Sequence, residues 1–105
     1  ILRVARSDPD KQARVDGVRA FAASLGPGLK GRVKDLYPIL ENDPDFEVRL
    51  AAVEELGALG NALKDDAETI AMLRKRLSDP QAKVRIAAAE AIKRIEQPPP
   101  PEKKP

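Results

Sequence analysis

An Asp-Pro dipeptide occurs three times in this chain, and each copy is followed by the same pattern of residues. The dipeptides begin at residues 8, 43 and 79, so their spacings are 35 and 36 residues. A sequence that matches itself at a period of about 20–50 residues is typical of a solenoid of stacked supersecondary units. An Arg stands six residues after each Asp and is followed by an apolar residue. The repeated polar residues are Asp8, Asp43, Asp79, Arg14, Arg49 and Arg85.

Apolar residues recur within each copy at offsets of 5, 7, 10 and 13 residues from the Asp. Steps near three place these residues on one face of a helix, whereas a strand would need strict alternation. The four columns are Ala13, Val48 and Val84, then Val15, Leu50 and Ile86, then Val18, Val53 and Ala89, and finally Phe21, Leu56 and Ile92. Each Asp is expected to be the N-cap of its helix, because its carboxylate can accept hydrogen bonds from free amides. Pro is expected at the first helical position.

A second helical segment is expected between successive Asp-Pro helices. The clearest example is "DDAETIAMLRKRLSD", in which Ile70, Leu73 and Leu77 make an apolar stripe. Asp65 and Glu68 resemble a capping box at its start. These features predict that each repeat is a pair of helices.

The counterpart of this segment in the preceding repeat, "LKGRVKDLYPILEN", contains Pro38. We expect either a kink there or a helix that begins late, near Leu36. The patterns together predict an incomplete first helix and then helices at about 9–25, 30–42, 44–58, 66–78 and 80–96. The helical domain is expected to span residues 1–97. Residues 98–105 begin with four consecutive prolines and are expected to form a linker or tail.

Two of the copies, "DPDFEVRLAAVEEL" and "DPQAKVRIAAAEAI", resemble HEAT repeats, in particular the bacterial HEAT-like type also found in phycobilin lyase subunits. The first copy departs from the pattern, with Ala13 in place of Val and Asp16-Gly17 in place of Ala-Ala. The resemblance covers residues 1–96. It implies an all-α fold, a right-handed α-solenoid of stacked antiparallel helix pairs with about 2.5 repeats, from a larger bacterial protein.

In such families the turn Asp and the helix Arg interact within and between neighbouring repeats. The resemblance therefore implies a ladder of ion pairs that sets the register of the repeats. The members of this Asp-Arg ladder would be Asp8, Asp43, Asp79, Arg14, Arg49 and Arg85. The alternative is a row of Arg residues that binds phosphate. The constant spacing of each Arg from its Asp favours the structural interpretation.

Several common catalytic sites need residue types that this chain does not contain. It has no His and no Cys, which excludes a Ser-His-Asp triad, a thiolate nucleophile and a disulfide. Asp65, Asp66 and Glu68 could form a carboxylate cluster for a divalent cation, but their simpler role is to start a helix. We therefore predict a noncatalytic chain with no cofactor and no metal site.

The charge balance does not indicate a strongly anionic partner, since 19 basic and 17 acidic residues leave a net charge of +2. Nucleic-acid binding is the alternative function, because Arg74, Lys75 and Arg76 form a short basic run. Aromatic residues for base stacking make up only 3% of the chain, which argues against it. A regulatory, subunit-like domain of an enzyme is a second alternative.

The preferred function is a protein–protein interaction or scaffolding module that binds a protein partner or a neighbouring domain. Exposed positions of the Asp-Pro helices carry both signs of charge, which suits a specific polar contact. This predicted interaction ridge consists of Arg19, Glu54, Glu55, Glu90, Lys93 and Arg94. Apolar Ile1, Leu2 and Val4 indicate either earlier repeats or self-association through the N-terminal end. No apolar run approaches the roughly 18 residues of a membrane span. The compartment is not determined, although the cytoplasm is favoured over the periplasm.

Overall fold

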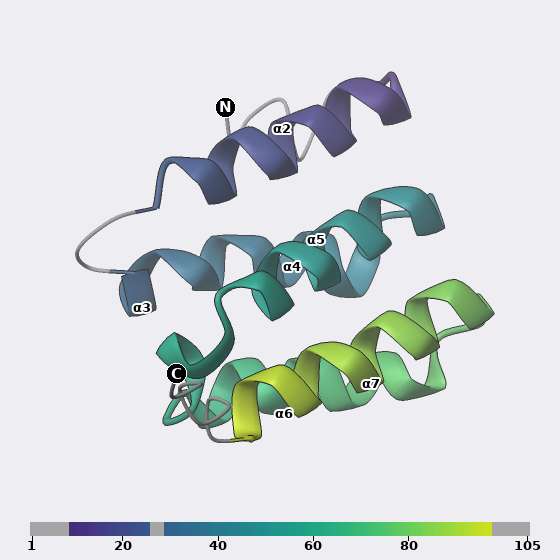
Figure 1. Cartoon of the computed structure of the whole chain (residues 1–105). Coiled ribbons are helices and arrows are strands. Elements are labelled where there is room, and N and C mark those ends of the chain that lie inside the picture. Colours follow the sequence, from purple (N-terminus) through teal and green to yellow (C-terminus); the bar gives the residue numbers. More distant parts are fainter. Residues whose placement is uncertain (1–8, 26–28, 98–105) are drawn as a thin grey trace, which may run out of the picture.

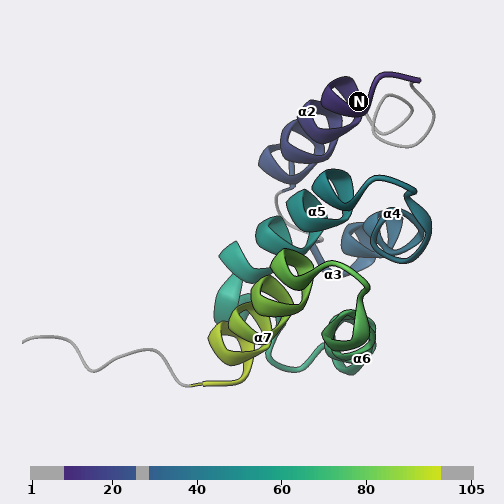
Figure 2. The same ribbon diagram turned by 90° about the vertical axis from the view of Figure 1, so that its right-hand side faces the viewer.

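Helices make up all the regular secondary structure in residues 9–25 and 29–97, the part of the chain that the computed structural model describes. They lie in two layers, which Figures 1 and 2 show from two directions. One layer holds the three Asp-Pro helices, α2 (Lys11–Ala23), α5 (Phe46–Ala58) and α7 (Ala82–Glu96). The other layer holds α3 (Leu29–Arg32), α4 (Tyr37–Asn42) and α6 (Ala67–Lys75). The predicted all-α fold of stacked helix pairs is confirmed.

The Asp-Pro helices α2, α5 and α7 begin two residues later than the sequence predicted. Their N-caps are Asp10, Asp45 and Gln81, so the prediction that Asp8, Asp43 and Asp79 cap these helices is wrong. Instead, the Asp43 carboxylate accepts a hydrogen bond from the Asp45 N–H at 2.9 Å. The Asp79 carboxylate accepts one from the Gln81 N–H, also at 2.9 Å. Each carboxylate therefore closes a short turn ahead of the helix and keeps its other lone pairs for a different partner.

Pro38 divides the helical segment between α2 and α5, as the sequence predicted. Val33–Leu36 form a 3₁₀ helix, η1, and α4 begins at Tyr37 with Pro38 in its first turn, where the missing N–H is not needed. The buried Tyr37 hydroxyl lies 2.6 Å from Oγ1 of Thr69 in α6. Burial raises the pKa of Tyr37, although the hydrogen bond with Thr69 opposes the shift. This contact joins α4 to α6 within the second layer.

Both ends of α6 differ from the prediction. Its N-cap is Asp66 rather than Asp65, and the Asp66 carboxylate accepts a hydrogen bond from the Thr69 N–H at 3.0 Å. At the other end the chain tightens into a 3₁₀ helix, η3 (Arg76–Ser78), which departs from the α-helical spacing of the predicted stripe. Leu77, predicted to lie in that apolar stripe, lies in η3 and is 41% exposed.

Asp66→Ala is expected to lower the free energy of unfolding by about 0.5–2 kcal/mol, because the Thr69 amide loses its acceptor. The matched control is Asp65→Ala, one residue earlier, which should change stability by less than about 0.5 kcal/mol. Urea unfolding followed by far-ultraviolet circular dichroism measures both. Equal losses from the two variants would contradict the assignment of Asp66 as the cap.

Small residues bring the Asp-Pro helices close together. Ala52 and Ala88 are fully buried, and a Cβ added to Gly57 of α5 would lie 2.9 Å from the Cβ of Ala91 in α7. Gly60 follows the end of α5 with a φ of 52°, a left-handed conformation that suits glycine after a helix. Larger apolar residues fill the space between the two layers. The fully buried ones are Val18, Val33, Leu36, Leu40, Val48, Val53, Leu56, Leu63, Leu73, Val84 and Ile95.

Candidate functional site

Arg14 of α2 and Asp43, which precedes α5, form an ion pair between neighbouring repeats. Arg14 Nε donates to Asp43 Oδ2 at 2.9 Å, and its Nη2 donates to Asp43 Oδ1 at 3.3 Å. Nη2 also donates to the carboxylate of Asp45. The hydrogen bond to Asp43, aided by the charges of both carboxylates, raises the pKa of Arg14 against the opposing effect of burial. The side chains of Arg14 and Asp43 are only 9% and 5% exposed, so the pair is largely removed from solvent.

Arg49 of α5 and Asp79, which precedes α7, repeat this arrangement. Arg49 Nε and Nη2 donate to the two Asp79 carboxylate oxygens at 2.8 and 3.1 Å, and Nη1 donates to the Asp43 carbonyl at 2.6 Å. Arg76 Nη1 also donates to Asp79, at 3.2 Å. Burial alone would raise the pKa of Asp79. Hydrogen bonds from Arg49 and the Gln81 N–H, together with the charges of Arg49 and Arg76, outweigh burial and hold the pKa of Asp79 below its ordinary value.

Arg85, the third Arg of the predicted ladder, makes no ion pair within the described residues. Its Nη1 donates instead to the carbonyls of Asp79 and Pro80, at 2.8 and 3.2 Å. Asp8, the first Asp of the ladder, lies outside the described residues. The structure thus places two of the three Arg residues against the Asp of the next repeat and leaves the third with backbone acceptors.

A groove of about 700 Å³ lies between α5 and α7 and reaches Arg19 of α2. The predicted ridge residues Arg19, Glu54, Glu90 and Arg94 line it, whereas Glu55 and Lys93 lie outside it. Sequence reasoning missed the apolar floor of this groove and one further cation. Helical spacing is the one sequence signal that could have indicated these residues. It does not distinguish them from core residues, which have the same spacing. The missed residues are Leu50, Val53, Gly57, Lys83, Ile86, Ala87 and Ala91.

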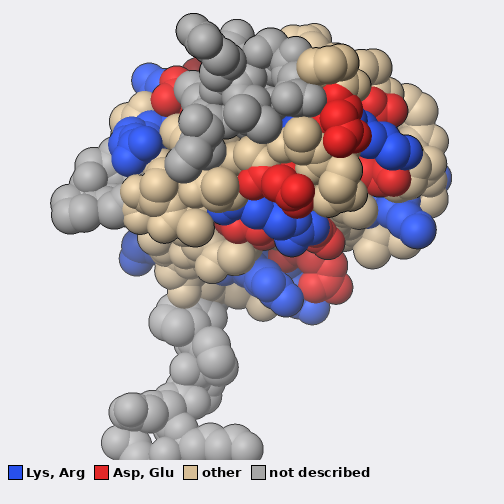
Figure 3. Space-filling model, turned by 90° about the horizontal axis from the view of Figure 1, so that it is seen from above, with Lys and Arg blue, Asp and Glu red and all other residues tan. Residues whose placement is uncertain are grey.

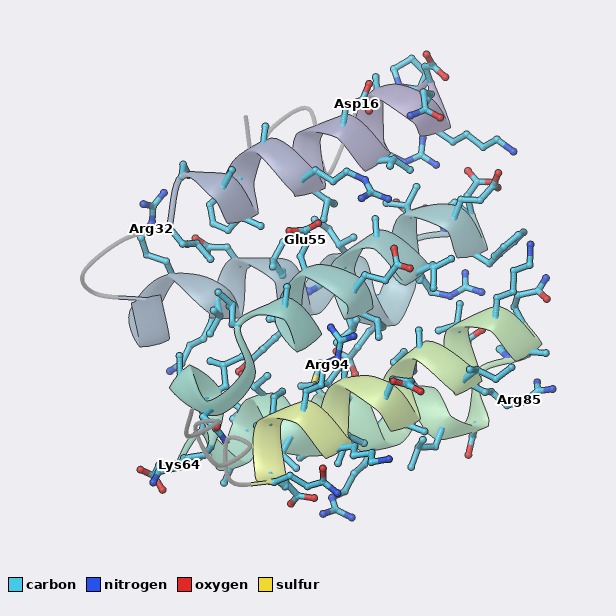
Figure 4. The ribbon with its side chains drawn as sticks, viewed as in Figure 1. Asp16, Arg32, Glu55, Lys64, Arg85 and Arg94 are labelled. Carbon is cyan, nitrogen blue, oxygen red and sulfur yellow. The ribbon has the colours of Figure 1, made fainter. Side chains whose placement is uncertain are left out.

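The charges along the groove are only partly neutralised by one another. Arg19 lies 3.6 Å from Glu54 and 3.8 Å from Glu55, in ion pairs that link α2 to α5. Within the described residues, Lys83, Glu90 and Arg94 make no hydrogen bond or ion pair. Figure 4 shows Glu55 between α5 and α2, and Arg94 reaching from α7 toward α5. On the face that Figure 3 shows, basic and acidic side chains lie beside one another without a large patch of one sign.

A family model described as HEAT repeats matches residues 33–103, more than half of the chain. The chain belongs to the HEAT-repeat family. HEAT repeats generally mediate protein–protein interactions and are generally noncatalytic. Comparisons with curated proteins and with solved structures returned no significant match.

The basic run on α6 and η3 of this HEAT-repeat chain is engaged in intramolecular ion pairs. Each of its three cations lies within 3.4 Å of a carboxylate oxygen. The pairs are Arg74 with Glu96, Lys75 with Glu41, and Arg76 with Asp79. Phosphate binding by this run would have to compete with these three pairs.

The carboxylates considered as a cation site belong to a helix start, because Asp66 caps α6. Across residues 9–25 and 29–97, no group of three or more His, Cys, Asp or Glu converges as metal ligands would. In the same part of the HEAT-repeat chain, no helix is both long enough and apolar enough to cross a bilayer.

Proposed function

We propose that this chain is a noncatalytic protein-binding module of a larger protein, and that its partner docks in the groove between α5 and α7. The supporting observation is an apolar floor beside charges of both signs in the same groove, three of which make no ion pair within the described residues. Protein interfaces typically join an apolar centre to a polar rim in this way. A bacterial origin for the larger protein stays a prediction.

The centre of the groove offers an anchoring point for an apolar side chain. Ile86 is 65% exposed, and Leu50 and Val53 lie across the groove from it on α5. Binding energy at interfaces concentrates in such central contacts, which are shielded by a ring of polar residues. Here Lys83, Glu90 and Arg94 supply that ring, so the best-fitting partner segment carries one large apolar residue between an acidic and a basic one.

Nucleic acid fits the groove less well than a protein does. Cations and carboxylates alternate along it, so a phosphate backbone would meet Glu54 and Glu90 as well as Arg19 and Arg94. Aromatic residues for base stacking are also missing from the surface. Phe21 and Tyr37 are buried, and Phe46 is partly buried against the core. These features favour a protein partner.

The test is affinity capture from a cell extract with the wild-type chain, with Ile86→Asp and Arg94→Glu, and with a control, Lys64→Glu. Lys64 is exposed and lies on the connection between α5 and α6, away from the groove (Figure 4). We expect one or more proteins to bind the wild type and the control, and to bind the two groove variants about tenfold or more weakly. Circular dichroism confirms folding of each variant. Equal capture by all four proteins, or capture of nucleic acid alone, would overturn the proposal.

A further inference from the structure

The groove between α5 and α7 is bounded by one face of each helix. On α7 its lining runs from Lys83 to Arg94, and on α5 it runs from Leu50 to Gly57. A rise of about 1.5 Å per residue gives the α7 side a length of about 16 Å, which is about three helical turns. Figure 1 shows that α5 and α7 lie side by side and run in the same direction. The groove is therefore long enough for a helix of about three turns to lie along it.

The floor of the groove is apolar, and the size of its side chains changes along its length. Leu50 and Ile86 lie nearer the start of α7, whereas Gly57 and Ala91 lie nearer its end. Gly57 and Ala91 are both buried, and a Cβ added to Gly57 would lie only 2.9 Å from the Cβ of Ala91. Neither residue has a side chain large enough to fill the groove above this contact. The groove therefore has room for a large apolar side chain of the partner near the end of α7.

The groove lacks the neutral polar side chains that would bind an extended peptide backbone. Among the described residues, no Ser, Thr, Asn, Gln or Tyr lines it. Its polar side chains are all charged and all exposed. They are Arg19, Glu54, Lys83, Glu90 and Arg94. Hydrogen bonding to a peptide backbone would partly remove these charges from water, which costs free energy.

An extended segment in this groove would leave part of its backbone without hydrogen-bond partners. Its N–H and C=O groups would face the apolar floor, and buried backbone groups need partners. The walls are helices, whose interior N–H and C=O groups already bond to one another. A partner helix avoids this cost because its own backbone groups are bonded internally. The lining therefore favours a helical partner over an extended one.

The charges of the groove alternate in sign along α7. Lys83 lies near the start of the helix, Glu90 follows about two turns later, and Arg94 follows about one turn after that. Glu54 of α5 is the counterpart of Glu90 in the repeat, so carboxylates flank both sides of the middle of the groove. Arg19 lies 3.6 Å from Glu54, whereas Glu90 makes no ion pair within the described residues. A complementary helix therefore carries a basic residue at its middle and an acidic residue near each end.

We propose that the partner segment is an amphipathic α-helix that lies along α5 and α7. This inference rests on the proposed function, which places the partner in this groove. The apolar stripe of the partner helix covers the floor, and its charges pair with Lys83, Glu90 and Arg94. In a partner helix that runs parallel to α7, these charges fall at positions i, i+7 and i+11, with apolar residues at i+3, i+6 and i+10. In an antiparallel helix the same order is reversed.

Fluorescence anisotropy with designed peptides tests this proposal. Two labelled peptides of about 15 residues carry the pattern, one in each direction. We expect at least one of them to bind the wild-type chain. A proline at a central position that faces away from the groove breaks the peptide helix and should weaken binding about tenfold or more. Exchanging the acidic and basic residues of the peptide should weaken binding to a similar extent, because each attraction becomes a repulsion.

The matching change in the protein is the double substitution Lys83→Glu and Arg94→Glu. Both side chains are exposed, so circular dichroism should show the wild-type fold. The double variant should bind the charge-exchanged peptide about tenfold or more tightly than the original peptide, because the attractive pairs are restored. Lys64→Glu, which lies away from the groove, should keep the preference of the wild type.

Equal binding of the helical peptide and its proline variant, or an unchanged preference in the double variant, would overturn the proposal. Failure of both peptides to bind at about 1 mM would also overturn it. In each case, weaker capture from extract by Ile86→Asp and Arg94→Glu would leave the proposed function intact. Capture that persists in those two variants would instead contradict the proposed function, even where the peptides bind.

Discussion

Asp79→Asn is expected to lower the free energy of unfolding by about 3–5 kcal/mol, the usual effect of removing one partner of a buried ion pair. The Asp79 side chain is 0% exposed and accepts hydrogen bonds from Arg49, Arg76 and the Gln81 N–H. Without its charge, two guanidinium groups stay close together in a site with little solvent. Arg76 Nε is already buried without a hydrogen-bond partner in this structure. The loss is large for a domain whose total stability is about 5–15 kcal/mol.

Urea unfolding at neutral pH measures this effect, with Asp65→Asn as the matched control at an exposed carboxylate. The control should change stability by less than about 0.5 kcal/mol. An exposed ion pair contributes less than about 1 kcal/mol to stability. If Asp79→Asn lowers the free energy of unfolding by no more than that, the Asp79 contacts contribute little to the fold.

The same site predicts the direction of a pH dependence. The pKa of Asp79 is lower in the folded chain than its ordinary value, so the ionised carboxylate stabilises the fold. The stabilisation by ionised Asp79 is complete at pH values above about 4, the pKa of its carboxyl in the unfolded chain. It is lost as the pH falls through the lower pKa that this carboxyl has in the folded chain. The stability difference between wild type and Asp79→Asn should therefore be constant near neutrality and shrink in acid. A difference that grew as the pH fell would contradict this assignment.

Gly57→Val is expected to lower the free energy of unfolding by about 3 kcal/mol, the upper part of the range for overpacked cores. A Cβ at this position would lie 2.9 Å from the Cβ and 3.1 Å from the Cα of Ala91. The Cα belongs to the backbone of α7, so relief would need a movement of the whole helix. Ala58→Val is the control, because Ala58 is the next residue of the same helix and is exposed.

A smaller pair of substitutions separates the steric clash from a change in helix propensity. Gly57→Ala gains up to about 1 kcal/mol of propensity but still adds the clashing Cβ, so we expect a net loss of stability. Ala91→Gly removes the opposing Cβ. Gly57→Ala should therefore lower the free energy of unfolding less in an Ala91→Gly background than in the wild type. Additive effects of the two substitutions would show that the helices are not in contact at this point.

The period of the repeat and the break at Pro38 could be predicted because their causes are local. Pro38 lacks an N–H and therefore marks a helix start wherever the chain is helical. The helical spacing of Val48, Val53 and Leu56 correctly identified buried residues, all of which are 0% exposed. These features depend on neighbours within a few residues, so they need no knowledge of the stack.

The exact helix starts could not be predicted, because distant residues compete for the capping side chains. Asp43 binds Arg14, 29 residues earlier, and Asp79 binds Arg49, 30 residues earlier. Local pattern rules treat both carboxylates as available to the first turn of their own helix. In the folded chain each carboxylate closes the turn before the helix and uses its remaining lone pairs on a neighbouring repeat.

The sequence by itself determined the repeat, the pairing of helices and which side of each helix is apolar. Only the tertiary structure decided which of these apolar sides is covered and where a groove remains. Val15, Leu50 and Ile86 occupy one column of the repeat, yet Val15 is 8% exposed, Leu50 is partly buried and Ile86 is 65% exposed. The physical reason is that burial depends on the helix that packs from the next repeat, and the spacing within one repeat carries no information about that neighbour.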